Sequence, residues 1–471
     1  MSFIEERKYQ TYLLSTLKKI HKQDIPPPPV MIELDCGMGK RIISYLLVSE
    51  YFPSQKTLIL LQATSSLSET ADFFQNKYKM EIGILGSRTP AWKRESILQD
   101  YRVVLATPQT LANVYKKNPS ANYGFEIILI NEVDKLIRRT ATRRNLVFPY
   151  PDLIDNFQCQ NNDPWIIGLS GTLRDSHIIV TDRVRLKREL QTLADNFPNV
   201  RVITMDEIMS VDEDFSNHIN YTALRGHAVY DDDIYEVFTK LDELVLEYRN
   251  EIIREARAEG LIDQSTKNLA LIAGNLAVDS SLTGKYNSLL LMRKYVSAML
   301  PLKYKPFLKR FPEFSNEEVE MLSDKSKKLQ ELPTLLKNHK KSVIMVSYIF
   351  TGDIICKYLE KAGYTTFMIS GKVNDKNAVI NQFRECESDQ VALIMTQVGE
   401  RDLDIPQADL IVVYDMVNTV KTMYQRFKRT RGGEVICMFY AETSEQKKAE
   451  RLFKGVKEKY LWSTKVEEIS F

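Results

Sequence analysis

Short runs of β-branched and aliphatic residues recur through the first 180 residues and alternate with longer stretches of helical spacing. The runs are VMIEL from residue 30, TLILL from 57, RVVLA from 102, EIILI from 126 and WIIGL from 165. Apolar runs of this length, each followed by an amphipathic segment, are typical of parallel strands covered by helices on both faces. The pattern predicts an α/β domain over residues 1–182.

The same alternation resumes near residue 341. Its runs are SVIMVS from residue 342, TTFMIS from 365, VALIM from 391, DLIVVY from 409 and EVICMFY from 434. Each is followed by a polar or amphipathic segment, so we expect a second α/β domain over residues 336–471.

The stretch between these domains has a different pattern, because RVITM near residue 201 is its main strand-like run. Apolar side chains instead recur at helical spacing, as at Ile234, Val237, Phe238, Leu241, Leu244, Val245 and Tyr248. A stripe with this period is typical of an amphipathic helix. We therefore predict a mainly helical insertion over residues 183–335.

Composition excludes two classes of protein for this chain of 471 residues. Its 44% hydrophobic content is too high for a disordered tail, and 64 Lys and Arg against 62 Asp and Glu exclude a polybasic binder. The net charge of +2 is nevertheless an average. Acids outnumber bases about threefold over residues 206–263, whereas residues 285–310 carry bases with no acid among them. Those bases fit a solvated helix face or a phosphate-contacting surface equally well.

Nothing in the sequence predicts a membrane segment or a metal centre. No apolar run approaches the roughly 20 residues needed to span a bilayer, and the first residues carry acids where a signal peptide is basic and then apolar. The chain is therefore expected to be cytoplasmic, with no membrane partner. The five cysteines are scattered without a CxxC pair and the five histidines are dispersed, so we predict buried thiols and no metal-binding residues.

The first predicted strand runs into DCGMGKR over residues 35–41 and then into an apolar helix. Glycines let backbone N–H groups surround a phosphate, and a lysine neutralises its charge. The candidate nucleotide-binding residues are Gly37, Gly39, Lys40 and Arg41. In a working phosphate loop the residue after the lysine is Ser or Thr, whose hydroxyl binds Mg²⁺, but here it is Arg41.

A second segment with candidate catalytic residues, Asn131-Glu132-Val133-Asp134, directly follows the strand EIILI. Phosphate-loop ATPases place an acidic segment here, in which the first Asp holds Mg²⁺ and the Glu orients the attacking water. Glu132 is therefore a candidate catalytic residue, whereas Asn131 stands in place of the metal-binding Asp. In the second α/β domain, TQVGERDLDIP from residue 396 precedes QRFKRTRGG from residue 425. A basic helix led by glutamine can supply arginine fingers to a phosphate loop, which makes Gln425 and Arg429 candidates.

The order of these motifs resembles that of superfamily 2 helicases, most closely the archaeal Hef and eukaryotic FANCM type, over nearly the whole chain. The resemblance implies two RecA-like parallel-sheet domains, 1–182 with motifs Q, I, Ia, II and III and 336–471 with motifs IV, V and VI. The helical insertion at 183–335 would lie between them and grip branched or duplex DNA.

The resemblance also assigns roles to single residues. Gln10, in the RxYQ opening RKYQ, would read adenine, and Asp404 would belong to the nucleotide site. Thr64, Thr107, Gln109 and Thr110 would contact the nucleic-acid backbone. The remaining candidates for phosphate contact are basic: Arg143, Arg144, Lys303, Lys305, Lys309 and Arg310. ATP is the expected nucleotide, and Mg²⁺ would have to bind at an altered site.

The departures from the family pattern fall at positions that would bind and hydrolyse ATP. They are Arg41, Asn131, Asp402, Lys428, Arg431 and Gly432. Losing one charge-stabilising group typically costs on the order of 10²–10³ in rate, so we expect hydrolysis to fall by roughly 10³–10⁶. Two roles are open for Arg41: it holds phosphates in place of the metal, or it pairs with Asp35 or Glu132 and closes the pocket.

The favoured hypothesis is a Hef-like protein that binds branched or duplex DNA, has absent or weak ATPase activity and acts as a partner in DNA repair or fork processing. Because Hef joins such a motor to an XPF-family nuclease, we expect such a nuclease as a partner in trans. A loose sliding-clamp motif begins at Gln446, although helical packing also explains it. The alternatives are an active ATP-dependent DNA helicase or translocase and an RNA-binding module of the Dicer and RIG-I branch.

Overall fold

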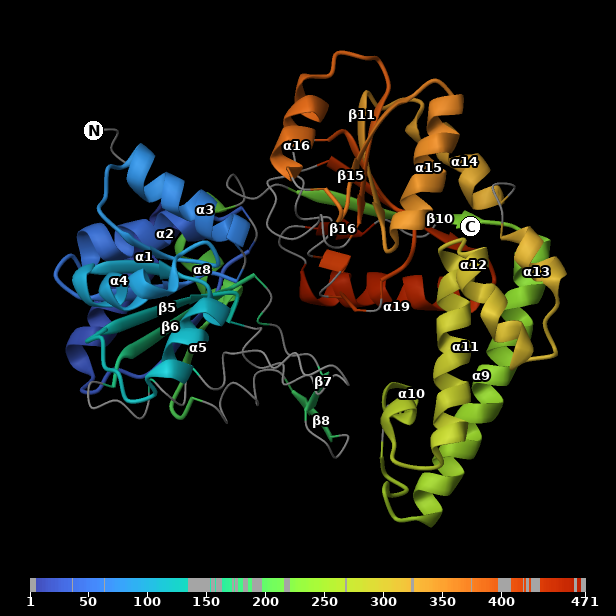
Figure 1. Cartoon of the computed structure of the whole chain (residues 1–471), viewed down its shortest axis with the longest axis horizontal. Coiled ribbons are helices and arrows are strands. Elements are labelled where there is room, and N and C mark those ends of the chain that lie inside the picture. The colour runs from blue at the N-terminus through green and yellow to red at the C-terminus, as the bar shows by residue number, and fades with distance from the viewer. Residues whose placement is uncertain are drawn as a thin grey trace. The chain divides into compact units, whose positions relative to one another are not determined.

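The computed structural model consists of two compact units, residues 1–219 and 220–471, and each is described by itself (Figure 1). It describes residues 6–466 with gaps. The gaps are at 36, 63, 134–152, 154–156, 158–162, 172, 174–176, 181–184, 189–196, 216–220, 267–268, 323–325, 374, 397–407, 418, 421–422, 425–432 and 461–463.

The first unit is built on a seven-stranded parallel sheet in the order β3-β4-β2-β5-β6-β1-β9. The strands are β1 (Val30–Glu33), β2 (Thr57–Leu60), β3 (Gly83–Leu85), β4 (Val103–Ala106), β5 (Ile127–Asn131), β6 (Trp165–Ser170) and β9 (Arg201–Ile203). All five runs predicted from hydrophobicity form strands, and β3 and β9 complete the sheet. β1, β2 and β4 are buried along their whole length, as expected for a sheet covered on both faces.

Helices connect these strands (Figure 1). They are α1 (Lys8–Gln23), α2 (Lys40–Leu46), η1 (Leu47–Tyr51), α3 (Thr64–Asp72), η2 (Phe73–Lys77), η3 (Ala91–Lys93), α4 (Arg94–Asp100), α5 (Pro108–Lys117) and α8 (Met205–Val211). A separate antiparallel pair, β7 (His177–Val180) and β8 (Arg185–Arg188), lies between β6 and β9 in the chain. α1 forms because Leu13, Leu14 and Leu17 line its buried face at helical spacing.

The segment 201–215 belongs to the first unit, which differs from the predicted insertion start at 183. β9 pairs in parallel with β1, with Arg201 opposite Val30. Beyond α8, the Asp212 carboxylate accepts a hydrogen bond from the Tyr9 N–H at 3.3 Å, and the rings of Tyr9 and Phe215 lie 5.7 Å apart. These contacts fold the segment back onto α1, so the division falls after Ile219 rather than after residue 182.

The second unit contains another seven-stranded parallel sheet, in the order β12-β13-β11-β14-β15-β10-β16. Its strands are β10 (Thr222–Val229), β11 (Lys341–Val346), β12 (Thr365–Ile369), β13 (Val391–Thr396), β14 (Leu410–Val413), β15 (Gly433–Tyr440) and β16 (Thr464–Val466). β10 was expected within the helical insertion, but it pairs with β15 along its full length, from Thr222 opposite Gly433. Its side chains alternate between buried and half-buried positions, as in a strand.

The helical insertion is therefore shorter than predicted and runs from α9 to α14. Its helices are α9 (Asp232–Ala258), α10 (Leu269–Ile272), η6 (Ala273–Asn275), α11 (Ser280–Ser297), α12 (Pro301–Tyr304), η7 (Lys305–Lys309), α13 (Asn316–Met321) and α14 (Lys327–Leu336). α9 and α11 lie side by side (Figure 1), and Arg293 of α11 pairs with Asp242 of α9 at 3.0 Å. The remaining helices of the unit are α15 (Ile349–Lys361), α16 (Lys376–Glu385) and α19 (Ser444–Lys459).

A buried ion pair fastens the end of the insertion to the second sheet. The Lys328 ammonium, at the start of α14, lies 3.3 Å from both carboxylate oxygens of Glu445 at the start of α19. Lys328 is fully buried, its ammonium lies 4.8 Å from the ring centre of Tyr440, and the Tyr440 N–H donates to Glu445 at 2.9 Å. Because a buried charge without a partner is costly, this arrangement fixes α14 against α19.

Two expectations from composition can be compared with the structure. Cys356, Cys386 and Cys437 are free thiols; the prediction of burial is confirmed for Cys437, whereas Cys356 and Cys386 are half-buried. Partial burial raises the pKa of the Cys356 thiol to about 11. Cys36 and Cys159 lie outside the described residues.

Within the described ranges, no helix has the length and apolar character that crossing a membrane requires.

Candidate nucleotide and nucleic-acid sites

A glycine turn joins β1 to α2 in the first unit. Gly37 and Gly39 have φ values of 83° and 74°, in the left-handed region that glycine adopts readily. The Met38 N–H donates to the Asp35 carbonyl at 3.3 Å within the turn. A Cβ atom on Gly39 would lie 2.9 Å from the amide nitrogen of Gln10. Position 39 therefore requires glycine both for its backbone conformation and for the close approach of Gln10.

Residues at the start of α1 support this turn. The Tyr9 hydroxyl donates to the Met38 carbonyl at 2.8 Å and accepts from the Gln10 side-chain nitrogen at 3.3 Å. The Gln10 side-chain oxygen accepts from the Arg7 N–H at 3.1 Å, and Gln10 is only 2% exposed. Burial raises the pKa of Tyr9, so its hydroxyl stays protonated as a donor. Gln10 thus lies against the turn with both ends of its amide hydrogen-bonded to protein, while its reading of adenine stays a prediction.

Lys40 and Arg41 begin α2, directly after the turn. The Arg41 guanidinium lies 2.6 Å from the carboxylate of Glu69 on α3, a partner that the sequence did not indicate. The two side chains are 40% and 30% exposed, and a pair with this much exposure is worth about 0–1 kcal/mol. The ammonium of Lys40 has no ion-pair partner among the residues that the structure describes. A phosphate could therefore pair with both cations, because breaking the Arg41–Glu69 ion pair costs little free energy.

The end of β5 lies at the same edge of the sheet, because β6 alone separates β5 from β1. Asn131 is the last residue of β5, and its side-chain oxygen is buried without a hydrogen-bond partner in the described part of the chain. Glu132 follows with a φ of 57°, which is unusual for a residue other than glycine. A buried, unsatisfied oxygen beside a strained backbone is more typical of a site than of a structural core.

The described residues fit a nucleotide phosphate better than they fit Mg²⁺. The glycine turn presents N–H groups, and Lys40 and Arg41 add positive charge, which is what a polyphosphate requires. Mg²⁺ prefers anionic and hydroxyl oxygens, yet Arg41 offers a cation and Asn131 a neutral amide at the two expected ligand positions. Nor does the described part of the chain contain a group of three acids, histidines or cysteines able to hold a metal.

The other half of this sheet edge, formed by β3, β4 and β2, carries the predicted nucleic-acid contacts. Thr64 is exposed at the start of α3, and Gln109 is exposed on the first turn of α5. Thr107 and Thr110 are instead buried, and their hydroxyls lie 2.8 Å apart. Thr64 and Gln109 are thus the two of these four residues that present side chains to solvent.

The predicted basic patch of the insertion lies on α12, η7 and the residue that follows them. Lys303, Lys305 and Lys309 are exposed, and Lys303 has its ammonium 5.9 Å from the ring centre of Tyr348. Arg310 is held by α11, since it donates to the Ser288 hydroxyl at 3.1 Å. None of the three lysines has an acidic partner within the described ranges. They are the bases of this patch that are available to a phosphate.

Five predicted site residues lie outside the described residues. They are Arg143, Arg144, Asp404, Gln425 and Arg429. Their roles stay predictions from the sequence. Tyr424, which directly precedes the glutamine-led segment, is buried, and its ring stacks on that of Tyr460 with the centres 3.7 Å apart.

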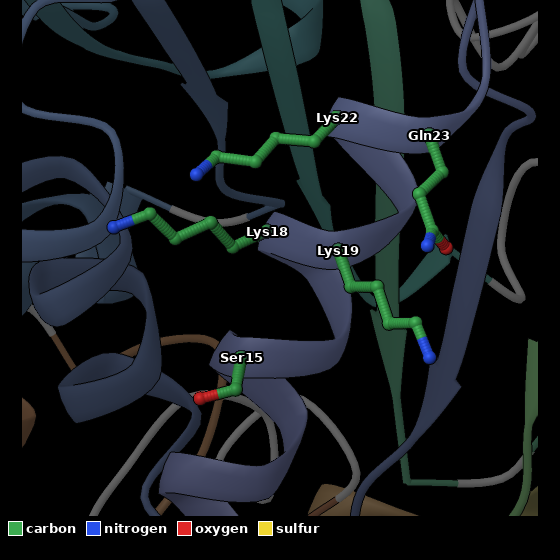
Figure 2. A pocket seen from close by; sticks show the side chains of 5 residues that line it. All are labelled: Ser15, Lys18, Lys19, Lys22 and Gln23. Carbon is green, nitrogen blue, oxygen red and sulfur yellow. The ribbon is translucent and has the colours of Figure 1, made fainter.

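A hollow on the exposed face of α1 is lined by Ser15, Lys18, Lys19, Lys22 and Gln23 (Figure 2). Lys18 and Lys22 extend to one side of the helix and Lys19 to the other. Eight residues of helix separate Gln10 from Lys18, a rise of about 12 Å. The hollow is therefore distinct from the glycine turn, and residues of this single helix form it.

Comparisons with known proteins agree with this architecture. Residues 3–175 match the family model described as type III restriction enzyme, res subunit. Residues 324–433 match the model described as helicase conserved C-terminal domain. The two matches fall on the first and second units, respectively.

Individual relatives match over shorter stretches. The pre-mRNA-splicing ATP-dependent RNA helicase prp28 of Schizosaccharomyces pombe is 28% identical over 119 residues, which is 24% of this chain and 18% of that protein. The human ATP-dependent RNA helicase DDX18 is 33% identical over 104 residues, 21% of this chain and 15% of that protein. The aligned part is thus less than a fifth of either relative.

A solved structure matches over almost the full length. The crystal structure of the Pyrococcus furiosus Hef helicase domain superposes with a TM-score of 0.57 and 17% identity, covering 95% of this chain and 98% of that one. At this identity the likeness establishes the fold alone.

Proposed function

Since the chain carries the helicase fold of superfamily 2, we propose that it binds branched or duplex DNA and hydrolyses ATP weakly or not at all. One observation supports weak or absent hydrolysis: the glycine turn lies at the same sheet edge as Arg41 and Asn131, which stand where the resemblance predicts metal ligands. Arg41 pairs with Glu69, and Asn131 contributes a neutral oxygen. Such a site retains the groups that attract a nucleotide and lacks those that organise Mg²⁺ for hydrolysis.

The expected loss of activity follows from the role of charge in phosphoryl transfer. Groups that stabilise the transferred phosphoryl act together, and losing one typically lowers the rate on the order of 10²–10³. With both protein contacts to the metal changed, we expect a rate roughly 10³–10⁶ below that of a working motor. Glu132, Gln425 and Arg429 would then be vestigial, while Gln10, Lys40 and Asp404 would still serve nucleotide binding.

ATP turnover in the presence of branched DNA tests the proposal. We expect a rate below about 1 s⁻¹, which is the lower limit of the roughly 1–10³ s⁻¹ typical of enzymes. Stimulated hydrolysis above that rate, abolished by Lys40→Ala, would establish an active DNA helicase or translocase instead. Lys40→Ala separates turnover at this site from that of a contaminating ATPase.

We assign DNA binding to two sets of residues, each considered by itself: the insertion lysines of the second unit, and the sheet edge of the first unit. Each phosphate contact contributes about −0.9 to the slope of log affinity against log salt, so replacing Lys303, Lys305 and Lys309 by Ala should flatten the slope by about 2–3 units. A matched control replaces Lys18, Lys19 and Lys22, three exposed lysines of α1 (Figure 2). Equal flattening by both triple variants would show a general effect of charge and would remove the insertion from the proposed surface.

The partner is proposed from family architecture: an XPF-family nuclease that this chain assists in trans, with a sliding clamp as a further contact. Stimulation of such a nuclease on branched DNA by the purified chain would support this role, and an unchanged cleavage rate would count against it. RNA is the second candidate ligand, because the two curated relatives above are named as RNA helicases. Competition between DNA and RNA duplexes of the same sequence decides between the two.

A further inference from the structure

The loop after β3 presents an indole to solvent. Trp92 is 77% exposed, whereas Trp165 in β6 is 4% exposed and its ring nitrogen donates to the Pro28 carbonyl at 2.8 Å. Tryptophan is highly buried on average, so exposure of nearly a whole side chain is unusual. Trp92 therefore does not contribute to the core.

The loop that carries Trp92 is well ordered by hydrogen bonds. The Thr89 hydroxyl donates to the Ile84 carbonyl at 3.1 Å and accepts from the Gly86 N–H at 3.0 Å. The Thr89 N–H donates to the Gly86 carbonyl at 3.0 Å, and Arg94 donates to the Thr89 carbonyl, also at 3.0 Å. These bonds fix the backbone on both sides of Pro90 and so the point from which Trp92 projects into solvent.

The charge of the loop favours a polyanion. Residues 86–94 include three bases, Arg88, Lys93 and Arg94, and no acid; the first acid beyond them is Glu95, in the first turn of α4. The Lys93 ammonium lies 4.9 Å from the ring centre of Trp92. Lysine is depleted at protein–protein interfaces, whereas aromatic rings beside cations are common where single-stranded nucleic acids bind.

The position of the loop joins it to the predicted strand-contacting residues. The Thr107 N–H donates to the Leu85 carbonyl at 3.0 Å, which ties the end of β3 to the start of α5 and hence to Gln109. A Cβ atom on Gly86 would lie 2.7 Å from the Leu67 side chain, so the loop also contacts α3, which begins at Thr64. The segment that leads from β3 to Trp92 thus begins beside the two helices, α3 and α5, on which Thr64 and Gln109 are exposed.

We propose that Trp92, assisted by Lys93, stacks on an unpaired base of a nucleic-acid strand whose backbone passes Thr64 and Gln109. The inference rests on the proposed nucleic-acid binding and specifies which part of a branched substrate this edge holds. In a duplex each base is already stacked between its neighbours, so an exposed ring finds a free base face in an unpaired stretch. Trp92 therefore favours single-stranded segments and junctions over continuous duplex.

Affinity measurements with two ligands test the inference on the full chain. We compare a 20-nucleotide oligothymidine with a blunt hairpin duplex, closed by a linker without bases, for the wild type, Trp92→Ala and Trp92→Phe. Stacking of a base on an aromatic ring should give Trp92→Ala about a 10-fold loss on the oligothymidine and less than about 2-fold on the hairpin. Trp92→Phe keeps an aromatic face and should retain most of the affinity. Unchanged melting temperatures would show that both variants are folded.

Intrinsic fluorescence gives a second readout. In a Trp462→Phe background, which removes the tryptophan outside the described residues, the oligothymidine should quench the emission of Trp92 and the hairpin should quench it far less.

Failure of the proposed function and failure of the inference give different results. A wild type that binds neither ligand overturns the proposed function, whereas binding that Trp92→Ala leaves unchanged, or weakens equally on both ligands, overturns the inference. Loss of self-association in Trp92→Ala without any effect on either ligand would assign the indole to a protein contact and also overturn it.

Discussion

The C-terminal edge of the first sheet has two halves with the same architecture and different chemistry. In the half formed by β5, β6 and β1, the glycine turn is followed by Arg41, and β5 ends in Asn131. In the half formed by β3, β4 and β2, the strands lead to Thr64, Trp92 and Gln109. Both halves are fixed by buried strands of one parallel sheet. The difference between them therefore lies in the side chains at the edge and not in the scaffold.

The comparison shows that binding and hydrolysis differ in how much substitution they tolerate. A polyanion is attracted by N–H groups and cations whose positions can vary by several ångströms. The Mg²⁺ ion that supports hydrolysis requires oxygen ligands at about 2.0–2.1 Å in near-octahedral geometry. Replacing one ligand residue therefore removes a ligand outright. A fold can thus lose catalysis at one half of an edge while the other half still binds nucleic acid.

The largest predicted effect is a gain of ATPase activity in the half formed by β5, β6 and β1. Arg41→Thr combined with Asn131→Asp places a hydroxyl and a carboxylate at the two positions where the resemblance predicts metal ligands. We expect ATP hydrolysis to rise about 100-fold or more, because each such group is worth on the order of 10²–10³. Steady-state turnover with and without Mg²⁺ measures the gain.

Two controls keep this result interpretable. Lys40→Ala in the double-variant background should abolish the gained activity, and each single reversion should recover little, because the ligands act as a unit. A double variant that binds ATP and Mg²⁺ but stays inactive would place the defect elsewhere, for instance at the Lys428 and Arg431 departures.

A moderate effect is expected in the half formed by β3, β4 and β2, which we propose to bind nucleic acid. Thr64→Ala with Gln109→Ala removes two exposed hydrogen-bonding side chains, each worth about 0.5–1.5 kcal/mol, so DNA affinity should fall about 5- to 150-fold. Thr110→Val is the matched control, since its buried hydroxyl bonds to that of Thr107. It should lower the free energy of unfolding by about 1 kcal/mol and leave DNA affinity unchanged. An affinity loss in Thr110→Val as large as in the double variant would contradict the assignment.

The smallest effect separates the two roles that the sequence left open for Arg41. Glu69→Gln removes the carboxylate that pairs with Arg41, and loss of this half-exposed pair should change the free energy of unfolding by less than about 1 kcal/mol. If Arg41 serves phosphates, its release should tighten binding of a non-hydrolysable ATP analogue without Mg²⁺ by about 2- to 5-fold. Titration calorimetry measures this, and weaker binding would show that Arg41 closes the pocket once it is free.

The sequence predicted those features that depend on local pattern. The apolar runs that form β1, β2, β4, β5 and β6 could be recognised without knowledge of distant contacts, because buried parallel strands are continuous hydrophobic stretches. The helical stripe of α9 was equally readable, and Ile234, Val237 and Leu241 are buried as predicted. The sequence predicted a glycine loop between β1 and α2, and the structure adds that Gly37 and Gly39 adopt the left-handed conformation.

Features that depend on distant contacts could not be predicted. The partner of Arg41 is Glu69, 28 residues away on another helix, and no spacing rule connects them. β10 was assigned to the insertion because its partner β15 begins more than 200 residues later. The exposure of Trp92 was likewise unpredictable, since the sequence alone would place a tryptophan in the core.

The contacts of Tyr9 have a consequence for where the first unit can be cut. Its hydroxyl supports the glycine turn, while its N–H and ring are held by Asp212 and Phe215. A fragment ending at residue 182 would include every motif expected in the first domain and would still lack these two supports. It should therefore bind nucleotide more weakly than a fragment ending at residue 219. The smallest fragment that keeps these supports of the proposed nucleotide site therefore extends past Phe215, beyond the last motif expected in the first domain.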